Sequence, residues 1–166
     1  QNSNLISRTD QNGNSTLFMY DALNRLIQND YPDGSTAQWT YNEASNKTSV
    51  TDPNGNITNF IYDCCRVTGI TDPLGNSDSF SYDANGNRLS HTNKTGQVFL
   101  FAYDALNRQV SHTDPLGNTS LVSYDPAGNA ISQIDPLGNA TTYAYNALNR
   151  LVIATNSLGG TQQYTY

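Results

Sequence analysis

The sequence predicts an all-β fold, an antiparallel meander of hairpins whose repeat unit is about 21 residues long. A tyrosine returns at an almost constant interval, at Tyr20, Tyr41, Tyr62, Tyr82, Tyr103, Tyr124, Tyr145 and Tyr166. A glycine keeps the same spacing, at Gly13, Gly34, Gly55, Gly75, Gly96, Gly117, Gly138 and Gly159. Two residue types in fixed phase indicate one supersecondary unit that stacks on its neighbours. Helix formers are scarce, whereas β-branched, aromatic and turn-forming residues are common.

These observations define a single array over residues 1–166, with about eight repeats of two strands each. Open sheets of more than about ten strands rarely stay flat. We therefore expect the sheet to curl into a spiral β-shell or a solenoid-like sheet.

The composition argues against several functional classes. Only 13% of the residues are charged and the net charge is −6, so the basic stripe of a nucleic-acid binder is missing. No run of about 18 apolar residues occurs, so we expect no membrane span. Gln1 begins in the middle of the repeat and Tyr166 ends on the repeat tyrosine, so we interpret the chain as a segment of a longer protein.

The first turn of each repeat is predicted by the pattern Asp-Pro-x-Gly. Asp can accept backbone N–H bonds, Pro restricts φ to a narrow negative range, and Gly tolerates a positive φ, which together favour a three-residue hairpin loop with a bulge. The pattern occurs at 52–55, 72–75, 114–117 and 135–138, and Tyr31-Pro32-Asp33-Gly34 is a variant. A second turn follows each repeat tyrosine, as at Asp21-Ala22-Leu23-Asn24.

Strand register can be counted outward from the first turn. Around 114–117 this count places Val110 opposite Val122, and it puts aromatic residues opposite aliphatic ones, which is a favourable cross-strand arrangement. The same count pairs Ile27 with Trp39, Leu89 with Phe101, Ile131 with Tyr143 and Val152 with Tyr164. One face of the sheet is therefore expected to be apolar.

The residues that this register places opposite the repeat tyrosines alternate between two types. They are Arg25, Asn46, Arg66, Asn87, Arg108, Asn129 and Arg150. We expect the post-tyrosine turn to alternate between a shorter and a longer form, which gives a period of two repeats. Each Arg is then predicted to stack on the tyrosine sixteen residues later, and each Asn to bond backbone from a longer turn. In this hypothesis the longer turn moves Lys47 or Arg88 to the other face.

Reactive side chains have structural interpretations. His91 and His112 lie one repeat apart, so their strands are about 9.6 Å apart, too far to share a metal ion. We interpret them as packed or exposed repeat residues, with a ligand or pH-sensing role as the alternative. Cys64 and Cys65 are adjacent, and we expect two buried or half-buried thiols that are poorly placed to bridge each other.

No catalytic residue, cofactor-binding residue or metal ligand is predicted. The turn aspartates are explained as caps, and they lack the spacing of calcium-binding β-rolls. No serine has a Gly-x-Ser-x-Gly context, and no nucleophile–base set emerges. We therefore expect a protein that is not an enzyme.

The combined motifs resemble a known family. Tyr-Asp-Ala-Leu-Asn-Arg at 20–25 and 103–108, with Asp-Pro-Leu-Gly-Asn at 72–76, 114–118 and 135–139, is similar to the YD repeat of Rhs (rearrangement hotspot) proteins. The repeat also occurs in the C components of insecticidal toxin complexes, wall-associated bacterial proteins and teneurins. The resemblance implies a long β-sheet that spirals into a hollow shell, often around a polymorphic C-terminal toxin. No self-cleavage site, toxin domain or spike-binding domain is recognised, so the resemblance concerns the shell alone.

The leading functional expectation is structural. The chain would form part of a secreted or cell-surface β-shell that encapsulates or scaffolds a toxin, with the rest of its parent chain and such a toxin as partners. A carbohydrate- or cell-surface-binding module is one alternative. A fibre protein that assembles through its sheet edges is another.

Overall fold

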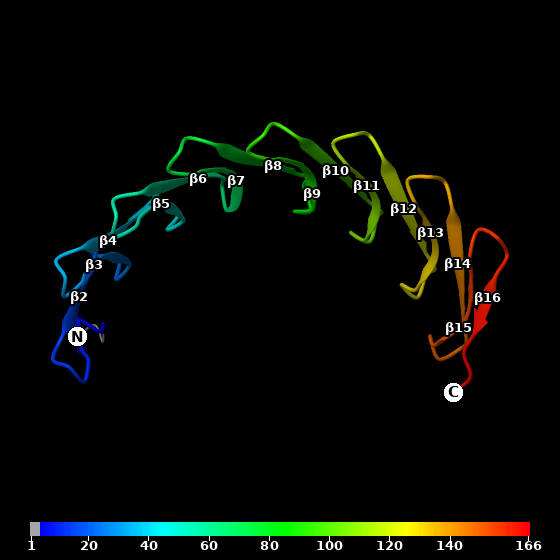
Figure 1. The fold of residues 1–166 in the computed structure, drawn as a ribbon, viewed down its shortest axis with the longest axis horizontal. Coiled ribbons are helices and arrows are strands. Elements are labelled where there is room, and N and C mark those ends of the chain that lie inside the picture. Colours follow the sequence, from blue (N-terminus) through cyan, green and yellow to red (C-terminus); the bar gives the residue numbers. More distant parts are fainter. Residues whose placement is uncertain (1–3) are drawn as a thin grey trace. The chain divides into compact units, whose positions relative to one another are not determined.

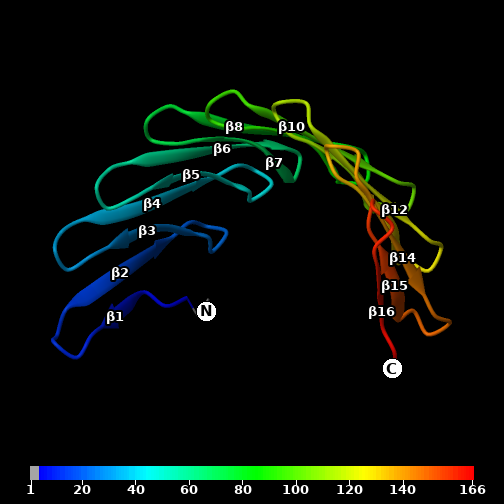
Figure 2. The same ribbon diagram turned by 45° about the vertical axis from the view of Figure 1, so that its right-hand side comes forward.

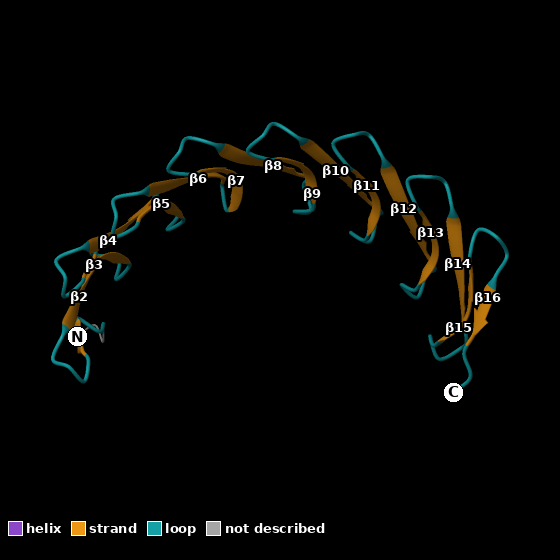
Figure 3. Cartoon of the chain, in the orientation of Figure 1, coloured by secondary structure: helices purple, strands orange, loops and turns teal. Residues whose placement is uncertain are grey.

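The computed structural model describes residues 4–166, and all of the regular structure in that range is β-strand (Figures 1 and 3). The strands are β1 (Ser7–Thr9), β2 (Ser15–Tyr20), β3 (Leu26–Asp30), β4 (Thr36–Tyr41), β5 (Lys47–Thr51), β6 (Ile57–Asp63), β7 (Arg66–Thr71), β8 (Ser77–Tyr82), β9 (Arg88–Thr92), β10 (Val98–Tyr103), β11 (Gln109–Thr113), β12 (Thr119–Tyr124), β13 (Ala130–Ile134), β14 (Ala140–Tyr145), β15 (Leu151–Thr155) and β16 (Thr161–Gln163). They form one open sheet of 16 strands in chain order. The predicted all-β antiparallel meander is confirmed.

The chain divides into two compact units, Gln1–Ser79 and Phe80–Tyr166. Within each unit the strands pair antiparallel with their neighbours in the sequence, as Figure 2 shows from a second direction. The prediction of a single array over residues 1–166 stays a prediction. No helix that could span a membrane occurs in the part of the chain that the structure describes.

One turn geometry recurs along the chain, and Asp114–Asn118 illustrates it. The Asp114 N–H donates to the Asn118 carbonyl at 2.9 Å, and the Gly117 N–H donates to the Asp114 carbonyl at 3.0 Å. Oδ1 of Asp114 accepts the N–H groups of Leu116 and Asn118, and Oδ2 accepts the Asn118 side-chain amide. Gly117 has a φ of 85°, which its missing Cβ allows. The predicted three-residue hairpin loop is thus confirmed.

The same two backbone bonds also form in the post-tyrosine turns. The first residues of all turns with this pattern are Asp10, Asp21, Tyr31, Asn42, Asp52, Asp72, Asp83, Asn93, Asp104, Asp114, Asp125, Asp135, Asn146 and Asn156. Arg25 and Asn46 therefore occupy the same turn position, and the predicted alternation of turn length is wrong. The exception is the short turn between Asp63 and Arg66, which are paired directly.

The predicted displacement of Lys47 and Arg88 is wrong for the same reason. With no residue inserted by the turn, both side chains stay on the aromatic face. The Lys47 ammonium lies 5.7 Å from the centre of the Trp39 ring. The Arg88 guanidinium lies 4.7 Å from the centre of the Phe101 ring.

The predicted register is confirmed. Gln28 pairs with Gln38, one step before Ile27 and Trp39. The Tyr164 N–H donates to the Val152 carbonyl at 3.0 Å. On the other side of six tyrosine strands a β-bulge shifts the register, as between Thr40 and Tyr41, where Tyr41 pairs with Lys47. Equivalent bulges precede Tyr20, Tyr62, Tyr103, Tyr124 and Tyr145.

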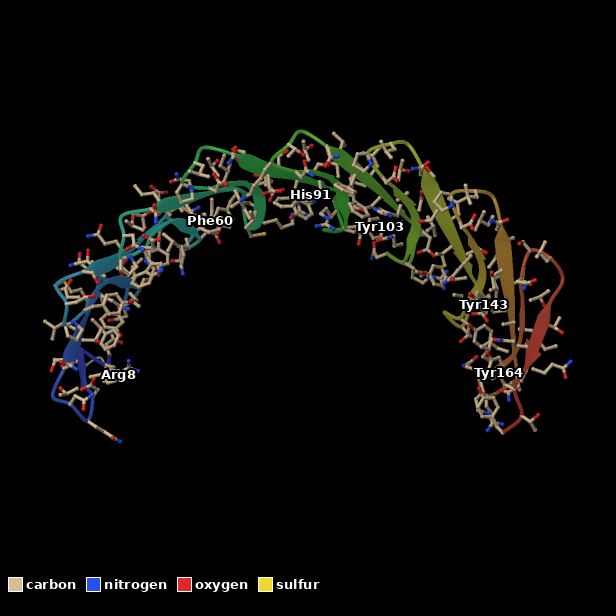
Figure 4. All side chains as sticks on the ribbon, viewed as in Figure 1. Arg8, Phe60, His91, Tyr103, Tyr143 and Tyr164 are labelled. Carbon is tan, nitrogen blue, oxygen red and sulfur yellow. The ribbon has the colours of Figure 1, made fainter. Side chains whose placement is uncertain are left out.

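The sheet has almost no buried core. Ala37, at 5% exposed, is the one buried hydrophobic residue among those described, and no side chain is fully buried. Along the strands, half-buried aromatic residues alternate with exposed residues on the opposite face. In Figure 4, Tyr103, Tyr143 and Tyr164 of the second unit project from one side of their strands. Each unit is therefore a single layer with one aromatic face.

We predict that acid destabilises the fold through its turn carboxylates. The side-chain amides of Asn56, Asn118 and Asn139 are the largest of the hydrogen-bond effects that lower the pKa of Asp52, Asp114 and Asp135, respectively. A carboxyl group with a depressed folded-state pKa stabilises the fold above its unfolded pKa of about 3.9 and loses this contribution as the pH falls through its folded value. Urea-unfolding midpoints should therefore stay level from about pH 7 to 5 and fall below about pH 4.

The control is a variant with Asp52→Asn, Asp114→Asn and Asp135→Asn. Asn93 already fills the first turn position with the same backbone bonds, so the variant should fold and show a shallower loss of stability in acid. An acid profile equal to that of the unaltered chain would contradict this role for the carboxylates.

Candidate functional site

The candidate site is the aromatic face together with the post-tyrosine turns that border it. At its centre lie the repeat tyrosines, and five of them donate a hydroxyl hydrogen bond to the backbone carbonyl fifteen residues earlier. Tyr41 donates to the Leu26 carbonyl at 2.9 Å and Tyr145 to the Ala130 carbonyl at 3.0 Å. Tyr20, Tyr62 and Tyr124 bond Leu5, Lys47 and Gln109 in the same way. Apart from Leu5, each of these acceptors is the first residue after the preceding post-tyrosine turn. Each hydroxyl thus ties one repeat to the one before it.

Arginine side chains cover the rings of alternate tyrosines. The guanidinium carbon of Arg25 lies 4.8 Å from the centre of the Tyr41 ring. Arg108 over Tyr124 and Arg150 over Tyr166 repeat this contact at 4.6 Å each. These three predicted stacks are confirmed. The fourth, Arg66 on Tyr82, would link the two units and stays a prediction.

Arg108 also links two successive turns. Its Nε donates to Oδ2 of Asp104 in its own turn at 2.7 Å, and Nη1 donates to the Asp125 carbonyl of the next turn at 2.9 Å. The pKa of Asp104 is lowered, first by the Arg108 backbone N–H and also by the guanidinium. Arg25 makes the equivalent pair of contacts, to Asp21 and to the Asn42 carbonyl.

The asparagines at the equivalent position link turns by a different route. Asn87 Nδ2 donates to Oδ1 of Asn107 in the next turn at 2.7 Å, and Asn129 Nδ2 donates to Oδ1 of Asn149 at 3.0 Å. The prediction that these side chains bond backbone is wrong for both. It is confirmed for Asn46, whose amide donates to the Cys64 carbonyl at 2.9 Å.

The two-repeat period follows from which residue occupies the left-handed position of each turn. Asn107 and Asn149 take a positive φ, 61° and 56°, in turns that end in Arg. In the turns that end in Asn87 and Asn129, a glycine holds this position. The turns that end in Arg therefore offer a side-chain oxygen, from Asn107 or Asn149, to the amide of Asn87 or Asn129. A glycine at the left-handed position offers no such acceptor. The alternation reflects complementary turn types rather than turn lengths.

The histidines pack among phenylalanine rings in the second unit. His91 stacks on Phe80 at 4.9 Å and on Phe99 at 5.7 Å between ring centres. His112 stacks on Phe101 at 5.2 Å and on Phe99 at 6.2 Å. This confirms the interpretation as packed repeat residues. Within residues 4–166 no cluster of three His, Cys, Asp or Glu side chains could hold a metal ion.

The cysteines differ from expectation. Cys64 and Cys65 are both exposed, not buried or half-buried, because they form the tip of the short turn between Asp63 and Arg66. The interval from Tyr62 to Tyr82 is shorter than every other interval between repeat tyrosines, so counting could have located this turn.

Comparisons with known proteins find a repeat family and solved structures that are similar to this chain. A family model described as RHS Repeat matches residues 2–36, 20–57, 66–98, 82–119 and 124–166. The chain resembles the crystal structure of TcdB2-TccC3 without its hypervariable C-terminal region, with a TM-score of 0.64, 18% identity, and 86% of this chain covered. It also resembles a Photorhabdus luminescens Tc holotoxin pore with a TccC3 mutation, with a TM-score of 0.60, 17% identity, and 92% of this chain covered. The chain spans 9% and 11% of those two chains. No curated protein sequence matches.

The stacking of Arg108 on Tyr124 can be measured by a double-mutant cycle. Arg108→Met keeps most of the apolar stem, and Tyr124→Leu removes the ring. We expect a coupling free energy of unfolding of about 0.5–1 kcal/mol, because a guanidinium over a partly exposed ring contributes that much.

The matched control pairs Arg108→Met with Tyr145→Leu, which removes the next repeat tyrosine. That cycle should give a coupling near zero. Equal coupling in the two cycles would contradict a specific Arg108–Tyr124 contact.

Proposed function

The chain belongs to the RHS repeat family, and from this premise we propose that it forms part of the wall of a β-shell in a secreted YD-repeat protein. In this proposal the shell encloses or scaffolds a toxin region of the same parent chain until delivery to another cell. The structural role needs no catalytic residue. It requires instead a sheet that can be extended and whose repeats hold one another in register.

The observation that carries the proposal is the aromatic face of each single-layer unit. Stable domains usually cover the apolar face of a sheet with a second layer. Here the rings remain half-buried, and within the described residues of each unit no second layer of strands or helices packs over them. A face of this kind suits the lining of an enclosure, where an enclosed chain or other shell segments exclude water from it.

The sheet edges support extension. Within residues 4–166, β1 and β16 each have a single neighbouring strand. Exposed edges of this kind pair readily with further strands. Additional repeats of a parent chain would satisfy both edges, and the small share of each similar structure that this chain spans is consistent with such a parent.

Recognition of carbohydrate is a second candidate that one observation favours. Tyr143 and Tyr164 bond glutamine side chains instead of backbone, and Tyr164 is 40% exposed, so these rings could stack on a sugar. Five repeat tyrosines already have their hydroxyls on backbone carbonyls, and three rings lie under arginine, which leaves fewer free rings for a ligand. The shell role is therefore the stronger proposal.

Limited proteolysis of the parent protein tests the shell role. Sequencing the gene on both sides of this segment defines that protein, and we expect further repeats followed by a C-terminal domain. In the native protein this domain should resist protease, and it should be degraded once denaturant unfolds the repeats, because the shell excludes the protease.

Cleavage of the C-terminal domain at the same rate in native and denatured protein would contradict enclosure. A glycan array tests the alternative, carbohydrate recognition. Selective binding of one glycan class by the chain, lost in Tyr143→Ala and Tyr164→Ala variants, would favour the recognition role instead.

A further inference from the structure

The short turn between β6 and β7 differs from every other turn of the described chain. Fourteen turns share the three-residue loop, whereas here Asp63 pairs directly with Arg66 and two residues form the tip. Both tip residues are cysteines, and Cys64 has a φ of 30°. The turn that departs from the repeat geometry is thus the turn that carries both thiols of the protein.

The two thiols lie side by side and face solvent. Their Sγ atoms are 3.5 Å apart, and both residues are exposed. The turn is held on two sides. The Asn46 amide donates to the Cys64 carbonyl at 2.9 Å, and the Arg66 guanidinium donates to Oδ2 of Asp63 at 3.1 Å. These contacts limit the motion of the backbone that carries the sulfurs.

A bond between the two sulfurs is geometrically unfavourable. Adjacent Cα atoms across a trans peptide are about 3.8 Å apart, whereas the Cα atoms of disulfides are usually about 4.4–6.8 Å apart. A disulfide between neighbours is therefore strained and easily reduced. A single atom placed between the sulfurs avoids this strain, because the two sulfurs then need not come into bonding contact.

We propose that Cys64 and Cys65 form a dithiol site that chelates a soft, thiophilic ion, with trivalent arsenicals as the class that fits two sulfurs and no other protein ligand. At a metal–sulfur distance of about 2.3 Å, sulfurs 3.5 Å apart subtend about 100° at a shared atom. Thiolates select soft ions over the hard cations that oxygen ligands prefer. The aspartate-rich turns of the rest of the chain offer only oxygen ligands, so the site is chemically separate from them.

The reaction with phenylarsine oxide balances without an oxidant. Two As–S bonds form and the arsenic–oxygen bond breaks. The oxygen leaves as water with the two thiol protons, and arsenic stays trivalent. The pKa of the Cys65 thiol is raised, chiefly by its hydrogen bond with Cys64, so at neutral pH this thiol carries the proton that it gives up on binding.

Phenylarsine oxide binding to the whole chain tests the proposal. Intact mass spectrometry should find one phenylarsenic group per chain, retained in excess glutathione and released by a dithiol such as 2,3-dimercaptopropanol. Cys64→Ser and Cys65→Ser each leave one thiol and should weaken retention at least about 100-fold, because the second bond is made at high effective concentration. Far-UV circular dichroism checks that each variant keeps its strands.

A second control keeps the number of thiols. Cys64→Ser combined with Ser157→Cys places the second thiol in another exposed turn. This variant should lose the glutathione-resistant adduct. The proposal is overturned if this double variant, or either single variant, retains the adduct as the unaltered chain does. It is also overturned if the unaltered chain takes up two phenylarsenic groups, or if Cys64 and Cys65 are isolated as a disulfide.

Discussion

The interaction on which the rest of the structure depends is the hydrogen bond that joins a repeat tyrosine to the repeat before it, which Tyr20, Tyr41, Tyr62, Tyr124 and Tyr145 form. A single-layer sheet cannot bury an apolar core, and among the described residues only Thr16, Ala37 and Gly69 are buried. Hydrophobic burial therefore cannot fix the position of each hairpin by itself. The tyrosine hydroxyl reaches back fifteen residues to a carbonyl beside the preceding turn, so the contact joins successive hairpins directly.

The turns add a second set of contacts between neighbouring repeats. Arg108 holds the aspartate of its own turn and a carbonyl of the next, while its guanidinium covers the tyrosine between them. Asn129 bridges from its own turn to Asn149, which can accept because it occupies the left-handed position. Partly exposed single contacts of this kind each contribute little. Their repetition along one border of the sheet gives a one-dimensional structure in which each repeat stabilises the next.

The fold was predictable because its turns are encoded locally. Proline fixes one dihedral, glycine allows a positive φ, and aspartate caps the loop, so the position of each hairpin and the register beyond it follow from a few residues. The register of Val152 and Tyr164 was correct for this reason. The stacks of Arg25, Arg108 and Arg150 also followed from counting, since a register places a residue opposite its partner.

The features that the sequence did not predict depend on contacts that no local sequence pattern contains. The bulges before tyrosines such as Tyr41 and Tyr145 change the register count on one side of the strand only, and nothing in the strand sequence marks them. The tyrosine hydroxyl bonds and the Asn–Asn bridges join residues 15 and 20 positions apart. The short turn at Cys64 and Cys65 shortens one interval between repeat tyrosines. The alternation of Arg and Asn was wrongly explained by turn length, because side-chain complementarity between neighbouring turns determines it.

The most direct measurement of the tyrosine bond compares two substitutions on one strand. Tyr145→Phe removes a hydroxyl that donates to the Ala130 backbone carbonyl, and Tyr143→Phe removes one that donates to the exposed Gln133 side chain. By urea unfolding, the first should cost about 0.5–1.5 kcal/mol. The second should stay within about 0.5 kcal/mol of the unaltered chain. Equal effects of the two substitutions, or no effect of the first, would contradict the claim that the repeat tyrosines tie successive hairpins together.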